Sequence, residues 1–139
     1  MKTGMIHNTA SIRVRYADTD KMGVVYNGVY LQYFEIGRTE MLRAMGLPYI
    51  VLEESGVLLP VLEAHLLYQK PAKYDDVLDI DATFVPDYSA TIRIDYVIRR
   101  NHDVLASGFT RHSFVHATSF KPIRPPAIFT DAVRLALNK

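Results

Sequence analysis

The feature of this sequence that most constrains its fold is the helical periodicity of residues 28–45. Apolar side chains and one glycine recur there every three or four residues, which is the spacing of one buried helix face. The members of this stripe are Tyr30, Phe34, Gly37, Met41 and Met45. Asn27 is the predicted N-cap, Gly46 suits the left-handed position after a helix, and Pro48 cannot continue one. Because the stripe is broad, we expect other structure to wrap this helix on more than one side.

Segments that favour strands lie on both sides of the helix. In residues 10–16, apolar side chains alternate with Ser11, Arg13 and Arg15, which predicts a strand with one buried face. Later segments rich in β-branched and aromatic residues predict further strands at residues 57–68, 77–85, 90–99 and 104–116. Short polar turns separate them, so we expect an antiparallel meander whose inner face packs on the long helix. The predicted class is α+β.

The last part of the chain is predicted to leave the sheet. Residues 121–126 contain three prolines, so they are expected to form an extended connector without a sheet ladder. Residues 130–137 suit a short helix, and Ser107 with Gly108 suggests a bulge inside a strand. With 139 residues, 49% of them hydrophobic, the chain is expected to form one domain over residues 1–139.

Charge and cysteine content disfavour several classes of function. Sixteen Lys and Arg against fifteen Asp and Glu leave a net charge of +1, so no basic field exists to bind nucleic acid. The absence of cysteine excludes disulfides, thiolate metal sites and a cysteine nucleophile. The N-terminus has no apolar signal segment, and no run approaches roughly eighteen apolar residues. We therefore expect a cytoplasmic protein with no nucleic-acid partner and no membrane span.

The sequence motifs do not indicate a metal site or a nucleotide-binding site. His112 and His116 share one face of a predicted strand but lie about 13 Å apart there, too far to chelate one metal. His7, His65 and His102 show no ligand spacing. The sequence contains no G-x-S-x-G elbow, P-loop or G-x-G-x-x-G pattern. The expectation is no metal and no cofactor.

The break between the first strand and the helix carries two carboxylates and a glycine, Asp18, Asp20 and Gly23. A helix N-terminus presents unpaired N–H groups and partial positive charge, which suit a developing oxyanion. A carboxylate beside it could take a proton from water or attack a carbonyl group itself. Locally, the same aspartates could equally shape a turn and cap amides. The pattern of residues alone leaves both roles open.

The motif around this break resembles a known family. Residues 15–27 read RYADTDKMGVVYN, and YL, YFE and RTE follow along the helix. This pattern is similar to the bacterial hot-dog thioesterases of the 4-hydroxybenzoyl-CoA and YbgC type. The resemblance implies an antiparallel sheet wrapped around one long central helix, and hydrolysis of an acyl-CoA substrate. The resemblance also implies that Asp20 is the catalytic carboxylate and that Asp18 has a structural role. It further implies that the backbone amides of Tyr26 and Asn27 bind the thioester oxygen. Many YbgC-type members have His where this chain has Asn27.

Further residues are candidates for support, and two other functions stay open. Tyr16, Gly23 and Val24 are predicted to line or shape the pocket. Glu35 and Arg38, three residues apart on the helix, are predicted to pair or to help place a water molecule. The alternatives are hydrolysis of acyl carrier protein thioesters and acyl-CoA binding without turnover. A sheet around one helix leaves open edges, so a homodimer or homotetramer with active sites at the subunit interface is expected.

Overall fold

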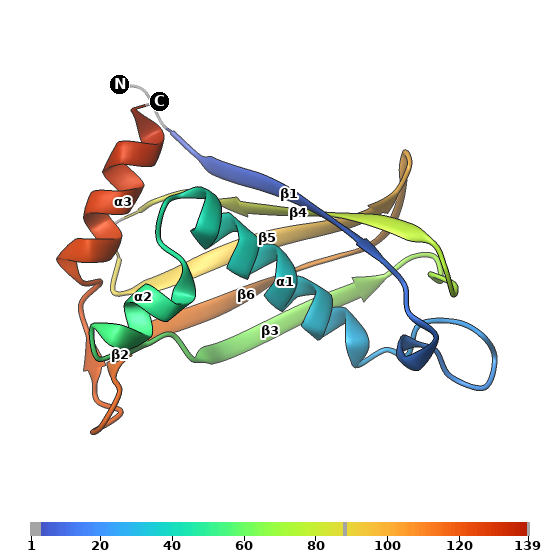
Figure 1. Cartoon of the computed structure of the whole chain (residues 1–139), viewed down its shortest axis with the longest axis horizontal. Helices are drawn as coiled ribbons and strands as arrows, with labels where there is room; N and C mark the ends of the chain where they lie inside the picture. The colour runs from blue at the N-terminus through green and yellow to red at the C-terminus, as the bar shows by residue number, and fades with distance from the viewer. Residues whose placement is uncertain (1–3, 88, 139) are drawn as a thin grey trace.

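The computed structural model describes residues 4–87 and 89–138, which contain a seven-stranded antiparallel sheet and three α-helices (Figure 1). The strands are β1 (Ile6–Arg13), β2 (Val57–Leu58), β3 (Val61–Tyr68), β4 (Val77–Phe84), β5 (Thr91–Arg100), β6 (Asp103–His116) and β7 (Pro122–Ile123). The helices are α1 (Val29–Ala44), α2 (Tyr49–Glu54) and α3 (Ala127–Leu137), and a short 3-10 turn, η1, covers Tyr16–Asp18. The predicted α+β class is confirmed.

Helix α1 crosses one face of the sheet, where it packs on β1, β4 and β5 (Figure 1). Every member of the predicted apolar stripe is buried, and Phe34 is completely so. Gly37 allows close approach to β4, because a Cβ at this position would lie 2.6 Å from Cγ2 of Ile80. The prediction of a central helix wrapped by other structure is therefore confirmed.

The two ends of α1 differ in how well the sequence predicts them. At the C-terminus, Gly46 has φ +83°, its N–H donates to Arg43 O (3.0 Å), and Leu47 N–H donates to Leu42 O (3.0 Å). This is the Schellman arrangement that a glycine in this position favours. At the N-terminus the prediction of Asn27 as the cap is wrong, because Gly28 occupies the N-cap position and no side chain caps the helix.

The sheet order departs from the predicted meander. Strands β4, β5 and β6 do follow one another, but β3 pairs with β6, and β1 takes the place beside β4. Strand β1 also starts earlier than predicted and ends at Arg13, so Tyr16 lies outside it. Strand periodicity shows which face is buried but does not show which strands pair, and this is why the meander prediction was wrong.

Two local predictions for the last third of the chain are also wrong. Ser107 and Gly108 form no bulge. Gly108 is needed instead because a Cβ there would overlap the carbonyl oxygen of His65 on β3. Pro122 and Ile123 do join the sheet as β7, at the end of β6, where His116 N–H donates to Lys121 O (3.0 Å). A two-residue edge strand tolerates the missing proline N–H. The predicted terminal helix exists as α3 and begins three residues earlier, at Ala127.

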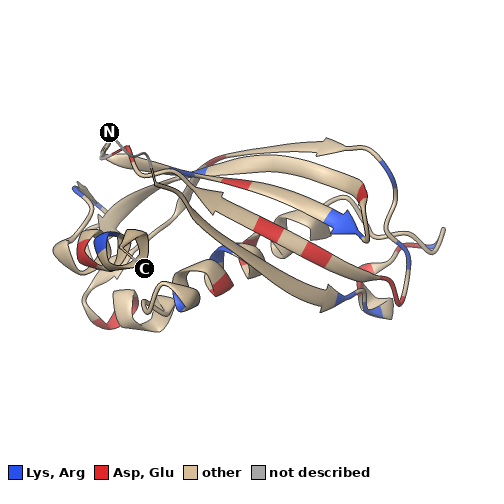
Figure 2. Ribbon diagram, turned by 90° about the horizontal axis from the view of Figure 1, so that it is seen from above, with Lys and Arg blue, Asp and Glu red and all other residues tan. Residues whose placement is uncertain are grey.

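Charged residues of both signs are interspersed over the strands and helices, as Figure 2 shows. On β4, Asp79 and Asp81 accept hydrogen bonds from Ser11 and Thr9 of β1 (2.6 Å each), and Arg99 of β5 also binds Asp81 (2.6 Å). These contacts tie neighbouring strands together across the outer face of the sheet. Among the described residues, no helix has the length and apolar character needed to cross a membrane.

Candidate active site

The chain between β1 and α1 folds back on itself as a small hairpin. Tyr26 N–H donates to Asp18 O (3.0 Å), and Asp20 N–H donates to Val24 O (2.9 Å). Gly23 closes the tip with φ +78°, a value that L-residues rarely adopt, and its N–H donates to Asp20 O (3.0 Å). The predicted turn is present, and the hairpin has Asp18 at its base, next to the start of α1 in the chain, and Asp20 at its tip.

Asp18 anchors the base of this hairpin. It is 4% exposed, and its carboxylate accepts hydrogen bonds from the Tyr33 hydroxyl (3.0 Å) and from the backbone N–H (3.1 Å) and guanidinium (2.9 Å) of Arg15. Burial opposes ionisation, but the hydrogen bonds from Arg15 and Tyr33 outweigh it and hold the pKa of Asp18 below its ordinary value. Burial and the neighbouring Asp18 raise the pKa of Tyr33, so its hydroxyl stays protonated as a donor.

Asp20 has a different environment at the hairpin tip. Its side chain is exposed, and one carboxylate oxygen accepts the N–H of Met22 (2.8 Å). The second carboxylate oxygen has no hydrogen-bond partner within the described chain. A carboxylate with an unused oxygen and access to solvent can act on water or on a bound electrophile.

The backbone amides at the start of α1 only partly match the prediction. The Tyr26 amide, one of the two predicted oxyanion donors, is already used in the bond to Asp18 O. The amides of Asn27 and Gly28 donate to no protein acceptor in residues 4–87 and 89–138. The two unpaired amides are therefore that of Asn27, one of the two predicted donors, and that of Gly28, which the sequence analysis did not name. Both stand at the positive end of the helix dipole.

A hollow of about 240 Å³ opens beside these amides. It is lined by Val24, Val25, Asn27, Tyr30, Tyr68, Gln69, Lys70 and Pro71. The first four belong to the motif and the start of α1, and the others come from the end of β3 and the chain after it. The sequence did not show that this second wall would lie beside the start of α1. Lys70 lies there with its side chain about half exposed, and it forms an ion pair with Asp103 (3.2 Å).

The predicted supporting residues separate into two groups. Val24 lines the hollow and Gly23 closes the hairpin tip. Tyr16 is 78% exposed, and its ring meets Tyr74 edge to face at 5.7 Å. Glu35 is exposed on α1, and the predicted pairing with Arg38 is wrong because the Arg38 guanidinium donates to the Tyr96 hydroxyl instead (3.1 Å).

Arg38 belongs to a buried polar cluster under α1. The Tyr96 hydroxyl bonds to the Thr110 hydroxyl (2.6 Å), which bonds to Nε2 of His112 (2.8 Å). His112 is fully buried, and its Nδ1 faces Leu59 O at 3.3 Å. Burial, assisted by Arg38, lowers the pKa of His112 to about 4, so this imidazole is neutral at physiological pH. The cluster joins α1 to β5 and β6 and is separate from the hairpin.

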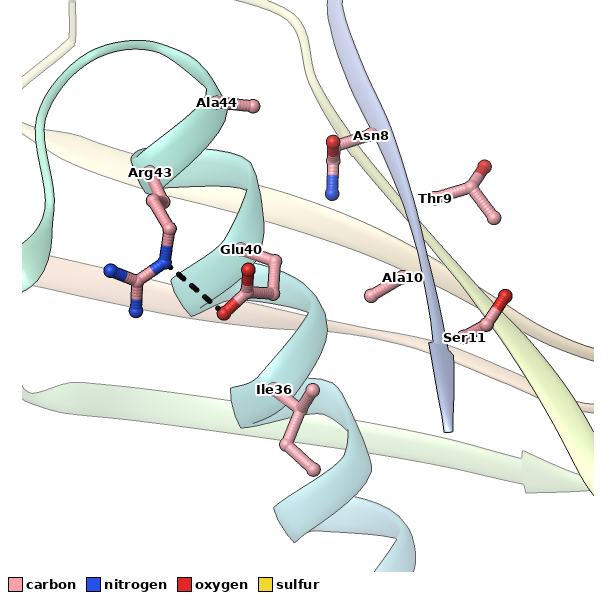
Figure 3. A pocket seen from close by; sticks show the side chains of 8 residues that line it. All are labelled: Asn8, Thr9, Ala10, Ser11, Ile36, Glu40, Arg43 and Ala44. Carbon is pink, nitrogen blue, oxygen red and sulfur yellow. Dashed lines mark hydrogen bonds and ion pairs between the residues drawn. The ribbon is translucent and has the colours of Figure 1, made fainter. Parts of the chain in front are cut away.

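A larger hollow, of about 490 Å³, lies between β1 and α1 (Figure 3). Its walls include Asn8 and Ser11 on β1, and Ile36 and the Glu40–Arg43 ion pair (3.3 Å) on α1. None of its lining residues belongs to the hairpin or to the free amides. Within the described residues, no three His, Asp or Glu side chains gather closely enough to hold a metal ion. The smaller hollow has walls from the hairpin and from Asn27, although Asp20 and Gly28 do not line it, so the hairpin and this hollow together are the candidate active site.

Comparison with known proteins places this site in context. Residues 14–134 match the family model described as the thioesterase-like superfamily. The chain is 34% identical over 116 residues to the acyl-CoA thioesterase YbgC of Haemophilus influenzae, covering 83% of this chain and 85% of that protein.

Solved structures agree with this match. The protein TT1821 of Thermus thermophilus superposes with a TM-score of 0.86 at 34% identity, covering 92% of this chain and 98% of TT1821. The DHNA-CoA thioesterase of Staphylococcus aureus superposes with a TM-score of 0.85 at 30% identity, covering 95% of this chain and 89% of that enzyme. These likenesses confirm the predicted hot-dog fold.

Proposed function

This chain belongs to the thioesterase-like superfamily, and we propose that it hydrolyses the thioester bond of an acyl-CoA, releasing a free acid and CoA. Residues 1–139 would act as one catalytic domain, with Asp20 as the carboxylate that acts on the thioester. The observation that carries the proposal is the hairpin, which exposes Asp20 at its tip and leads into the start of α1, where the N–H groups of Asn27 and Gly28 have no acceptor in the described chain.

The proposed chemistry has two possible first steps. As a general base, Asp20 takes a proton from water while the water oxygen bonds to the acyl carbon, and the C–S bond then breaks to release the CoA thiolate. As a nucleophile, an Asp20 oxygen bonds to the acyl carbon, the thiolate leaves, and water cleaves the resulting anhydride. Both routes place negative charge on the thioester oxygen.

The pairing in the hairpin defines how Asp20 and the free amides are arranged in this proposal. Asp18 pairs with Tyr26 and Asp20 pairs with Val24, so Asp20 stands at the hairpin tip, two residues or roughly 7 Å along the strand from Tyr26, and the free amides of Asn27 and Gly28 follow beyond Tyr26. We propose that a bound thioester lies along this hairpin, with its oxygen at the N–H groups of Asn27 and Gly28 and its acyl carbon toward Asp20. Removing one oxyanion donor in an enzyme typically costs about 3 kcal/mol of barrier, so two donors are a large part of such a site.

The hollow beside the amides supports a CoA thioester as the ligand. Its walls are apolar and aromatic near Val25 and Tyr30, which suits an acyl chain or ring. Lys70, with its half-exposed side chain, stands at this hollow and would meet a phosphate of CoA in place of its present partner Asp103. The contacts of Tyr16, Glu35 and Arg38 give them no direct part in this proposal.

A second copy of the chain is proposed to complete the site. Strand β3 bonds to β6 along one edge, and its exposed apolar side chains are Val61, Leu62, Leu67 and Tyr68. Pairing of two β3 edges would extend the sheet across both copies and cover these side chains. We expect two or four chains per particle in sedimentation equilibrium. A Leu62→Lys variant should shift the particle toward the monomer, and a monomeric native protein would contradict the proposal.

The test of function is thiol release from a panel of short-chain, long-chain and aromatic acyl-CoAs. We expect turnover of at least one of them by the native protein. Turnover of acyl carrier protein thioesters alone would show that the substrate's acyl group is carried by acyl carrier protein rather than by CoA. Binding of acyl-CoA without release of free thiol would instead identify a non-catalytic acyl-CoA-binding protein and would contradict the proposed hydrolysis.

A further inference from the structure

The chain that leaves β3 holds the candidate active site from one side. The Tyr68 hydroxyl donates to the carbonyl oxygen of Asn27 (3.0 Å). Val25 N–H donates to Ala72 O (2.9 Å), and Ala72 N–H donates to the hydroxyl of Tyr30 (3.3 Å). These bonds connect the end of a strand to a loop about forty residues earlier. The start of α1 is therefore fixed by contacts from outside the helix.

We propose that Tyr68 is a positioning residue for thioester hydrolysis, an inference that rests on the proposed function. Tyr68 binds the peptide unit that joins Asn27 to Gly28. That unit carries both the carbonyl that accepts the Tyr68 hydroxyl and the Gly28 N–H, one of the two free donors. Because a peptide unit is planar, holding its carbonyl also fixes the direction of its N–H. A hydrogen bond at the carbonyl further polarises the N–H and makes it a stronger donor.

The surroundings of Tyr68 support this role over simple packing. Its ring meets the buried ring of Tyr30 edge to face at 5.2 Å, which places the ring against the start of the helix. The Asn27 carbonyl also accepts the N–H of Tyr30, at the longer distance of 3.3 Å. Of these two bonds, only the one from Tyr68 connects the donor peptide to another element. Within a single chain Tyr68 is 45% exposed, so its hydroxyl contributes little to the packing of that chain's core.

Tyr68→Phe tests the proposal because it keeps the ring and removes only the hydroxyl. The matched control is Tyr74→Phe, a 55% exposed tyrosine whose ring also meets another tyrosine, Tyr16, edge to face. On an acyl-CoA that the native protein hydrolyses, we expect kcat of Tyr68→Phe to fall about 3- to 10-fold with little change in KM. Tyr74→Phe should keep the native kcat. Unchanged kcat in Tyr68→Phe, an equal loss in both variants, or a rise in KM alone would overturn the positioning role.

A second measurement does not depend on turnover. In a proton–nitrogen correlation spectrum, Tyr68→Phe should shift the Gly28 amide proton upfield, because its peptide carbonyl loses a hydrogen bond. The Gly28 signal should stay in place in Tyr74→Phe. A Gly28 signal unmoved by Tyr68→Phe would overturn the inference. If the native protein hydrolyses no ester, the proposed function fails and the catalytic role of Tyr68 falls with it, whereas the spectrum still reports separately on the bond between Tyr68 and Asn27.

Discussion

Asp18 and Asp20 lie two residues apart in one hairpin, but only Asp18 is buried and held by Arg15 and Tyr33. Asp20 is exposed and keeps one carboxylate oxygen without a protein partner in the described chain. Two residues of the same type thus have different roles, and their hydrogen-bond partners determine which role each one has. A carboxylate whose oxygens are all engaged holds the loop, whereas a carboxylate with an unused oxygen is left for chemistry. The base of the hairpin should therefore control stability, and its tip should control turnover.

The largest effect on stability is expected from Asp18→Ala. This change leaves the hydroxyl of the buried Tyr33 and the backbone N–H of Arg15 without their acceptor, so we expect a loss of about 3 kcal/mol in the free energy of unfolding. Asp20→Ala should cost less than about 1 kcal/mol, because its site is exposed. Urea denaturation of both variants measures the difference. Equal losses would remove the distinction between the base and the tip of the hairpin.

Acid should weaken a second buried polar site, the cluster around His112. The pKa of this imidazole is about 4 in the folded protein against 6.5 for an ordinary histidine, so the unfolded chain binds a proton first. Stability from this group is complete above pH 6.5 and is lost as the pH falls toward 4. We expect a loss of about 2 kcal/mol between pH 6.5 and pH 4.5.

Two histidine variants test whether His112 causes this loss of stability in acid. Denaturation across this pH range should give a smaller pH dependence for His112→Gln and an unchanged one for His102→Gln, because His102 is exposed. The pKa values of Asp18, Asp76 and Asp81 are lowered, so these carboxylates lose their contribution only below about pH 4. A native-like pH dependence in His112→Gln would contradict the assignment.

A smaller effect is expected from Tyr33→Phe, which removes one donor and keeps the Asp18 carboxylate and its bonds to Arg15. The expected cost is about 1.5 kcal/mol of stability. The pKa of Asp18 should rise toward its ordinary value, because a hydrogen bond that favours the ionised form is lost. Carbon-detected NMR titration of the Asp18 carboxyl group would measure this, and a pKa that stays at the native value would argue against the Tyr33 contact.

The smallest effect is expected at the hairpin tip. Met22 is 85% exposed, so Met22→Ala should change stability by less than about 0.5 kcal/mol. Thermal unfolding of this variant, beside Asp18→Ala as the sensitive reference, tests whether the tip is energetically separate from the base. A loss as large as that of Asp18→Ala would show that the two parts of the hairpin unfold together.

Local features of the fold could be predicted from the sequence, while distant pairings could not. The periodicity of residues 28–45 predicted α1 and Gly46 predicted its C-terminal end, because both features depend on neighbouring residues. The pairing of β3 with β6 depends on segments about forty to fifty residues apart, and alternation carries no information about it. For the same reason, the partner of Arg38 is Tyr96 rather than the nearby Glu35.

The candidate site shows the same limit. The motif pointed to Asp20 and to the start of the helix, and the structure places Asp20 at the tip of the hairpin that leads into this helix. The use of the Tyr26 amide by Asp18 could not be foreseen, because it depends on how the hairpin closes. Tyr68 and Lys70 reach the site only through the fold, so their position beside the helix start could not be predicted from the sequence.

The central claim is that Asp20 acts on the thioester while Asp18 holds the loop. The most direct test compares acyl-CoA hydrolysis by the native protein, Asp20→Asn and the control Asp131→Asn, whose exposed carboxylate pairs with Arg134 on α3. We expect a fall of about 100-fold or more in kcat for Asp20→Asn with a native melting temperature, and native activity for Asp131→Asn. Native kcat in a folded Asp20→Asn protein would contradict the claim and remove Asp20 from the reaction.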